Sequence, residues 1–134
     1  MDNLKQLNDA FGHSTGDLAL KETVSVLKRT LRPSDVVARL GGDEFTALLL
    51  EADANAAEIV SARIQSALRQ NSGKRYRVTY SIGVITCLSA PKSVDEIIEK
   101  ADNLMYEAKR DGKDTIKLAS YGGPDQSAGQ TDPG

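Results

Sequence analysis

The chain has 134 residues, about the length of one soluble domain, and 40% of them are hydrophobic, which is enough for one core. Its 17 Lys and Arg residues against 19 Asp and Glu residues give a net charge of −2, which argues against a protein that wraps nucleic acid or an anionic membrane. A single cysteine excludes a disulfide framework and fits the cytoplasm, and no apolar run is long enough for a membrane span.

Apolar spacing predicts one helix near the start of the chain. Pro33 would end a helix over 17–31, whose apolar residues recur at steps of four, three and four: Leu20, Val24, Leu27 and Leu31. The polar stretch 8–17 is rich in turn-forming residues, so turns and helix caps are its ordinary interpretation.

A β-hairpin is predicted next. Two β-rich runs, 36–40 and 45–50, flank Gly41-Gly42-Asp43-Glu44, and this pattern is typical of a hairpin with a four-residue loop. Apolar residues at helical spacing then predict a second helix over 55–70, which Asn71-Ser72-Gly73 would stop.

The second half of the chain predicts a strand, a helix and a strand. Residues 76–87 have the composition of a strand. The capping-box pattern at 93–96 begins a third helix over 94–108, and 115–118 indicates a last short strand.

These elements predict an α+β fold in which helices flank an antiparallel or mixed central sheet, and not an alternating parallel βαβ array. Residues 1–120 would form the domain. Residues 121–134 contain almost no apolar side chains after Tyr121, so they are expected to be a disordered tail or linker.

Two adjacent acidic residues at the predicted hairpin tip are the first candidates for chemistry. Successive side chains in extended backbone point to opposite faces, so Asp43 and Glu44 would have different tasks. One carboxylate would hold a hard cation such as Mg²⁺ and the other would accept a proton, while Gly41 and Gly42 leave the backbone open to a phosphate or a base. A solvated turn is the ordinary alternative.

Arg32 and Asp35 form a second candidate pair ahead of the first predicted strand. At about 3.3 Å per residue they lie roughly 15–20 Å from the acidic tip, so they cannot share its site. By spacing alone, the pair is a salt bridge at a helix exit, which contributes little at a surface.

The remaining polar candidates have structural alternatives. Asn8, His13 and Asp17 lie in the turn-rich stretch, where capping is the default role. Lys109 and Lys113 flank the end of the third predicted helix, where cations complement the helix dipole without any ligand.

Taken together and in order, the motifs resemble those of the GGDEF family of diguanylate cyclases. The match covers residues 1 to about 118 and consists of five motifs in register: Asp2-x-x-Lys5-x-x-Asn8-Asp9-x-x-Gly12-His13-x-x-Gly16-Asp17, Arg32-x-x-Asp35, Arg39-Leu40-Gly41-Gly42-Asp43-Glu44-Phe45, Ser81-Ile82-Gly83-Val84 and Ala101-Asp102-x-x-x-Tyr106-x-Ala108-Lys109. Such a match is far more specific than an isolated Gly-Gly-Asp-Glu-Phe.

The resemblance implies an enzyme that joins two GTP molecules into cyclic di-GMP and releases two pyrophosphates, with Mg²⁺ or Mn²⁺, on a fold like that of nucleotidyl cyclases and polymerase palms. A homodimer with two facing GTP-loaded sites would be the active species, and an upstream sensor domain would control it. No DNA, RNA or membrane partner is expected for this chain.

The resemblance also implies roles for individual residues. Asp43 would bind the metal together with the carbonyl of Met1, and Glu44 would be the base or organise the metal. The substrate would contact Lys5, Asn8, His13, Asp17, Gly41, Gly42, Lys109 and Lys113, with Asn8 and Asp17 reading the guanine edge. An allosteric site for the product would comprise Arg32, Asp35 and Arg63.

The chain departs from the family pattern in three places. Lys113-Asp114 stands where Arg-Asn is common, and Leu4 replaces an aromatic residue. The sequence also begins inside the family's first strand motif, so the first metal-binding aspartate, its strand and the preceding helix are expected to be missing, and Asp2 is the second aspartate of that motif.

Two other functions remain open on the sequence. A non-catalytic receptor domain would bind cyclic di-GMP at Arg32 and Asp35, or GTP without turnover, and signal by contact. An interaction scaffold would need neither site.

Overall fold

The computed structural model describes residues 1–123, and the predicted tail lies outside these residues from 124 on. The elements follow one another as α1 (Leu4–Phe11), α2 (His13–Thr30), β1 (Val36–Gly41), β2 (Glu44–Leu48), α3 (Ala54–Leu68), a π-helical stretch η1 (Arg69–Gly73), α4 (Lys74–Tyr76), β3 (Ile82–Cys87), α5 (Val94–Arg110) and β4 (Ile116–Tyr121). Within the described residues, no helix combines the length and apolar character that a membrane crossing requires.

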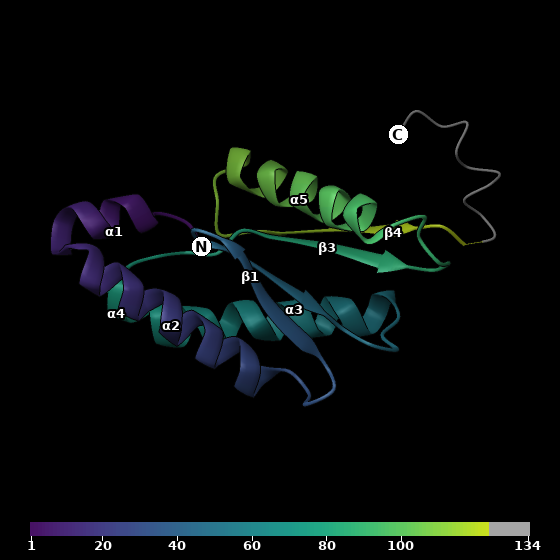
Figure 1. Ribbon diagram of the computed structural model, residues 1–134, viewed down its shortest axis with the longest axis horizontal. Helices are drawn as coiled ribbons and strands as arrows, with labels where there is room; N and C mark the ends of the chain where they lie inside the picture. Colours follow the sequence, from purple (N-terminus) through teal and green to yellow (C-terminus); the bar gives the residue numbers. More distant parts are fainter. Residues whose placement is uncertain (124–134) are drawn as a thin grey trace.

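The strands form two separate pairs (Figure 1). β1 and β2 are antiparallel, with Val36 opposite Leu48, whereas β3 and β4 are parallel, with Ile82 opposite Ile116. The predicted mixture of helices with antiparallel pairing is therefore confirmed. The pairing is mixed, as predicted, and a single crossover through α5 between β3 and β4 is not an alternating parallel βαβ array. The strands differ from the prediction in one respect, because they form two short sheets in place of one central sheet.

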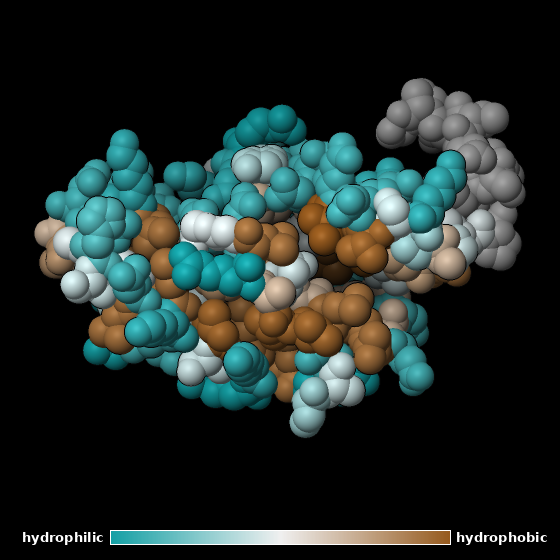
Figure 2. Space-filling view, viewed as in Figure 1, coloured by the Kyte–Doolittle hydropathy of each residue, from teal (hydrophilic) through white to brown (hydrophobic). Residues whose placement is uncertain are grey.

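The core lies where α2 and α3 meet the inner sides of the strands. Its buried residues are Met1, Leu7, Ala19, Leu20, Val26, Leu27, Leu68, Tyr76, Val78 and Tyr80. Val37 and Phe45 pack against this cluster from one face of the hairpin. Val36 and Leu48 lie on the other face, 53% and 58% exposed, and Figure 2 shows apolar side chains gathered over the part of the surface where the hairpin lies.

Several predicted boundaries are wrong. The stretch predicted as turns contains α1 and the start of α2, with Gly12 at φ 91° as the break between them, because Leu7 of α1 is buried in the core. The second long helix does not stop at Asn71-Ser72-Gly73 but continues through η1 and α4. As a result, β3 begins only at Ile82, and the residues before it have a single bridge, between Thr79 and Asp2.

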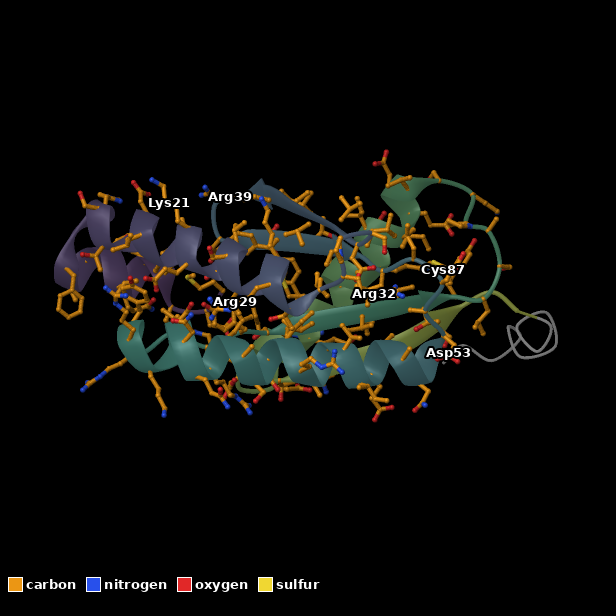
Figure 3. All side chains as sticks on the ribbon, turned by 90° about the horizontal axis from the view of Figure 1, so that it is seen from below. Lys21, Arg29, Arg32, Arg39, Asp53 and Cys87 are labelled. Carbon is orange, nitrogen blue, oxygen red and sulfur yellow. The ribbon has the colours of Figure 1, made fainter. Side chains whose placement is uncertain are left out.

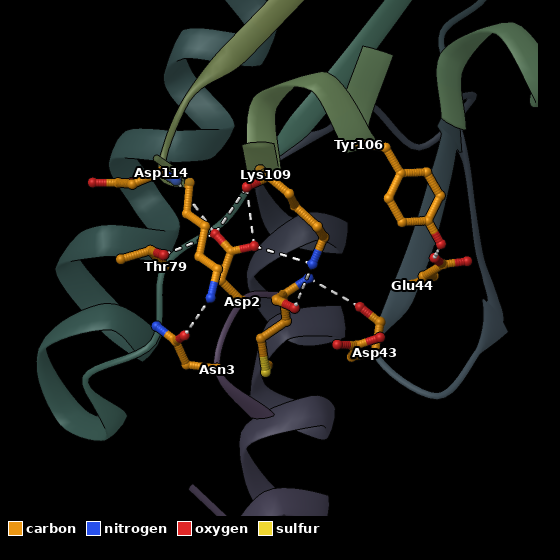
Figure 4. Close-up of polar contacts among 11 residues, drawn as sticks. Asp2, Asn3, Asp43, Glu44, Thr79, Tyr106, Lys109 and Asp114 are labelled. Carbon is orange, nitrogen blue, oxygen red and sulfur yellow. Dashed lines mark hydrogen bonds and ion pairs between the residues drawn. The ribbon is translucent and has the colours of Figure 1, made fainter. Parts of the chain in front are cut away.

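A buried carboxylate ties the first residues of the chain to its last helix and strand (Figure 4). Asp2 is 0% exposed. Its carboxylate accepts hydrogen bonds from the hydroxyls of Thr79 at 2.8 Å and Ser81 at 3.0 Å and from the backbone N–H of Asp114 at 3.3 Å. The Lys109 ammonium lies 3.1 Å from the same carboxylate, so α5, the α5–β4 turn and the approach to β3 converge on one group.

The network also determines the charge state of Asp2. Burial by itself raises the pKa of the Asp2 carboxyl, but the bonds from Thr79, Lys109, Ser81 and Asp114 outweigh it and hold the pKa below its usual value. A lowered folded-state pKa means that the ionised carboxylate stabilises the fold above its unfolded pKa of about 3.9. That stabilisation is lost as the pH falls through the folded-state pKa.

We expect Asp2→Ala to lower the free energy of unfolding by about 3 kcal/mol at neutral pH, because it leaves Lys109 partly buried without its partner. Denaturant unfolding of the variant and the wild type measures this difference, which should shrink below about pH 4. Asp9→Ala, which removes an exposed carboxylate from α1, is the control and should change stability by less than about 0.5 kcal/mol. Equal stability of Asp2→Ala and wild type would show that the network contributes nothing.

A close approach of backbones joins α5 to β3. A Cβ built on Gly83 would lie 2.1 Å from the carbonyl oxygen of Ala101 and 2.7 Å from the backbone nitrogen of Met105. Both obstructing atoms belong to the α5 backbone, so no side-chain rotation relieves the clash. Only glycine lets the helix pack at this depth on the strand.

Gly83→Ala should therefore destabilise the fold by about 1–3 kcal/mol, the usual cost of overpacking. Thermal unfolding followed by circular dichroism gives the measurement. Gly41→Ala is a matched control, because a Cβ there meets nothing within 4 Å. A melting temperature of Gly83→Ala equal to that of the wild type would contradict the close packing of α5 on β3.

Candidate functional site

The acidic residues lie at a tighter turn than the sequence predicts. Gly41 pairs with Glu44, so the hairpin loop has two residues, Gly42 and Asp43, in place of four. Gly42 has φ 24°, in the region that favours glycine. The Arg39 guanidinium donates to the Gly42 carbonyl from Nε at 2.9 Å and from Nη2 at 2.6 Å. These two hydrogen bonds hold the turn.

Different parts of the chain contact the two acidic residues (Figure 4). The backbone nitrogen of Met1 donates to the Asp43 carbonyl at 2.9 Å. The Tyr106 hydroxyl, from α5, donates to Glu44 Oε2 at 3.2 Å. The negative charge of Glu44 raises the pKa of Tyr106, so the tyrosine stays a hydrogen-bond donor.

The chemistry of the donors at the hairpin tip fits a hard cation. Mg²⁺ and Mn²⁺ prefer oxygen ligands, and Mg²⁺ is commonly held by one or two carboxylates together with substrate phosphates. Asp43, Glu44 and the carbonyl of Met1 offer only oxygen. Over residues 1–123, no group of three or more His, Cys, Asp and Glu side chains is placed to hold a metal ion.

The predicted phosphate-binding lysines lie around the first three residues, but two of them already have partners. Lys109, 25% exposed, pairs with Asp2 and lies 3.5 Å from the carbonyl oxygen of Met1. Lys113 Nζ donates to Asn3 Oδ1 at 3.1 Å. Lys5 is exposed on α1.

The predicted guanine-contacting residues come from both sides of the α1–α2 corner. Asn8 packs against α2, whereas His13 and Asp17 are exposed one turn apart on α2. Asp17 lines a cleft that continues to the hairpin, together with Leu20, Lys21, Val24 and Arg39. Figure 3 shows Lys21 and Arg39 close together on this side, so α2 and strand β1 of the hairpin line one cleft.

The second candidate site is formed as a unit. Asp35 accepts from Arg32 Nε at 3.3 Å and from Nη2 at 3.1 Å, and Arg32 also donates to the carbonyl of Leu50. The bonds from Arg32 outweigh the effect of burial and hold the pKa of Asp35 below its usual value. Arg63 of α3 lines the same cleft as this pair, so the three predicted residues meet at the opposite end of β1 from the hairpin tip.

Several structural roles were missed by sequence reasoning. Arg39 and Tyr106 belong to the quoted motifs, but nothing in their spacing indicates that they hold Gly42 and Glu44. The sequence identifies Asp2 by its motif position, and no local pattern indicates its burial. The Asp114 side chain binds Arg69 of η1 at 3.1 Å, a partner 45 residues away that no local pattern reveals.

Comparisons with known proteins agree with the motifs. Residues 1–115 match the family described as "Diguanylate cyclase, GGDEF domain". Diguanylate cyclase A of Treponema denticola is 37% identical over 123 residues, which cover 89% of this chain and 33% of that protein. The chain thus spans about a third of the length of this relative.

Solved structures show the same fold. An EAL/GGDEF domain protein from M. capsulatus has a TM-score of 0.73 and 34% identity over 87% of this chain and 78% of that one. A microbial GGDEF domain described in an interaction with cyclic di-GMP has a TM-score of 0.70 and 29% identity over 89% of this chain and 74% of that one. With a family match over most of its length, the hairpin signature in place and the fold shared, this chain belongs to the GGDEF family of diguanylate cyclase domains.

Proposed function

We propose that this domain is a diguanylate cyclase that condenses two GTP molecules into cyclic di-GMP and two pyrophosphates. The observation that carries the proposal is that Arg39, which lines the cleft with Asp17, also bonds the Gly42 carbonyl in the turn that bears Asp43 and leads into Glu44. A nucleotide whose base lies along α2 would bring its phosphates toward that tip. The Treponema relative, which is named as a diguanylate cyclase, supports the same activity.

The acidic tip would carry the chemistry. Asp43 and the carbonyl of Met1 would hold Mg²⁺ or Mn²⁺, which when bound neutralises phosphate charge. Glu44 would take the proton from a ribose 3′-hydroxyl, whose oxygen then bonds to the α-phosphorus of the second GTP as the bond to pyrophosphate breaks. Tyr106 would hold the Glu44 carboxylate in place through its hydrogen bond.

Substrate binding would involve both ends of the cleft. Asn8 and Asp17 would read the guanine edge, with the amide donating to the base carbonyl and the carboxylate accepting from base N–H groups. Lys5 and Lys113 would contact phosphates, together with His13 and the open backbone of Gly41 and Gly42. Lys109 would do so only in part, because it also neutralises Asp2.

Two bonds between two GTP molecules require two active sites that face each other, so we infer a homodimer as the active species. An upstream sensor domain would control its formation. The exposed, unbonded thiol of Cys87 is compatible with a cytoplasmic setting.

The Arg32 and Asp35 pair would bind the product and inhibit the enzyme, with Arg63 as a further contact. Two guanidinium groups on one cleft suit the two phosphates of cyclic di-GMP. Because this cleft lies at the far end of β1, its occupation would act on catalysis indirectly.

A receptor without catalysis is the alternative, and one contact favours it. The Lys109 ammonium lies 3.5 Å from the Met1 carbonyl oxygen, so a cation occupies the surroundings of the proposed metal ligand. Such a domain would still bind GTP or cyclic di-GMP and signal by contact.

We expect Asp43→Ala to reduce cyclic di-GMP formation from GTP and Mg²⁺ at least about 100-fold, the scale of losing one group that stabilises developing charge. The assay measures cyclic di-GMP chromatographically, with the full-length protein as the enzyme. Glu99→Ala removes an exposed carboxylate from α5 and should leave the rate unchanged. Turnover retained in Asp43→Ala would contradict its role, and a wild type that binds GTP without turnover would favour the receptor.

Arg32→Ala should weaken cyclic di-GMP binding by about tenfold or more, because hydrogen bonds to charged groups contribute about 1.5–3 kcal/mol. Isothermal titration calorimetry gives the affinity. Arg29→Ala, on the last turn of α2 (Figure 3), removes a nearby exposed charge and should have little effect. Equal affinity of wild type and Arg32→Ala would place the product elsewhere.

A further inference from the structure

Gly16 and Asn8 occupy one space at the corner between α1 and α2. A Cβ built on Gly16 would lie 1.7 Å from Asn8 Oδ1 and 2.8 Å from Asn8 Cγ. The Asn8 side chain therefore rests directly on the α2 backbone, in the volume that any other residue at position 16 would fill.

The backbone at this position does not itself require glycine. Gly16 lies inside α2, and its φ is not among the positive values that exclude other residues. Alanine forms helices better than glycine, so helix propensity opposes the residue found. The close approach of Asn8 is the reason for glycine that the structure supplies.

The contact orients the two ends of the amide differently. Asn8 Oδ1 is buried and has no hydrogen-bond partner among residues 1–123. Nδ2 lies farther from the Gly16 Cβ position, at 3.3 Å. The amide oxygen is thus the end of the carboxamide that lies nearest the Gly16 backbone, and the donating NH₂ group lies farther from it.

We propose that Gly16 is a positioning residue for guanine recognition. By lacking a side chain, it lets the Asn8 carboxamide seat its oxygen on α2 and present its NH₂ group to the base carbonyl of guanine. Adenine carries an amino group in place of that carbonyl, so the same orientation disfavours ATP. This inference rests on the proposed binding of GTP by Asn8 and Asp17.

The geometry also predicts how a substitution would relax. At Gly83 a new Cβ meets backbone atoms of α5, whereas at Gly16 it meets the end of a side chain. Rotation of Asn8 is the least costly response. Gly16→Ala is therefore expected to keep the fold and to displace the recognition group.

The experiment compares Gly16→Ala with Ser25→Ala, an exposed substitution on the same helix, and with Asn8→Ala. NMR spectra of the nucleotide-free chain follow the Asn8 side-chain NH₂ signals, and calorimetry gives the affinities for GTP and ATP. In Gly16→Ala the NH₂ signals should shift, GTP affinity should fall about tenfold and ATP affinity should stay constant. Ser25→Ala should match the wild type, and adding Gly16→Ala to Asn8→Ala should change neither affinity.

Unmoved Asn8 signals, or a further loss of GTP affinity in the double variant, would overturn the inference. If Gly16→Ala fails to fold, the double variant decides: its folding would demonstrate the steric conflict with Asn8, and its failure would show that Gly16 serves another contact. A wild type without preference for GTP over ATP would contradict the proposed guanine recognition. The NH₂ signals would still test whether Gly16 positions Asn8.

Discussion

The buried carboxylate of Asp2 is the interaction on which the arrangement of this domain depends. Two hydroxyls, a backbone N–H and the ammonium of Lys109 satisfy a charge that would otherwise be costly to bury. These partners come from the approach to β3, the α5–β4 turn and α5. The adjacent Met1 contacts the hairpin turn at Asp43. One short segment thus links the two strand pairs, which share no ladder in the described residues.

Two glycines show how similar contacts serve different ends. Gly83 removes a side chain so that a helix backbone can lie on a strand, which is a packing requirement of the core. Gly16 removes one so that the side chain of Asn8 can lie on the α2 backbone. The obstructing atoms distinguish the two cases, because backbone cannot move cheaply and the end of an asparagine can. Both residues belong to family motifs, and the sequence alone does not tell whether a motif glycine is needed for packing or for recognition.

The candidate site could be predicted only as a set of residue types. The order of the motifs identifies Asp43, Glu44 and the pair of Arg32 and Asp35 as candidates. The structure brings Arg63 to the same cleft as that pair. The contacts that constrain the site were not predictable: Arg39 on Gly42, Tyr106 on Glu44 and Lys109 on Asp2. Each joins residues whose facing geometry depends on turns and packing, and periodicity carries no information about such partners.

The local sequence pattern predicted those helices and strands whose formation depends mainly on residues nearby in the chain. The hairpin, α3 and α5 follow from apolar spacing, and the Ser93 hydroxyl caps α5 by accepting from the N–H of Glu96, as its sequence predicts. Tertiary structure decided the rest. α1 is helical because Leu7 reaches the core, and residues 78–81 pair only with Asp2 because no other strand reaches them within the described residues. Spacing reports which face of an element is apolar, whereas burial and partners depend on which distant elements cover that face.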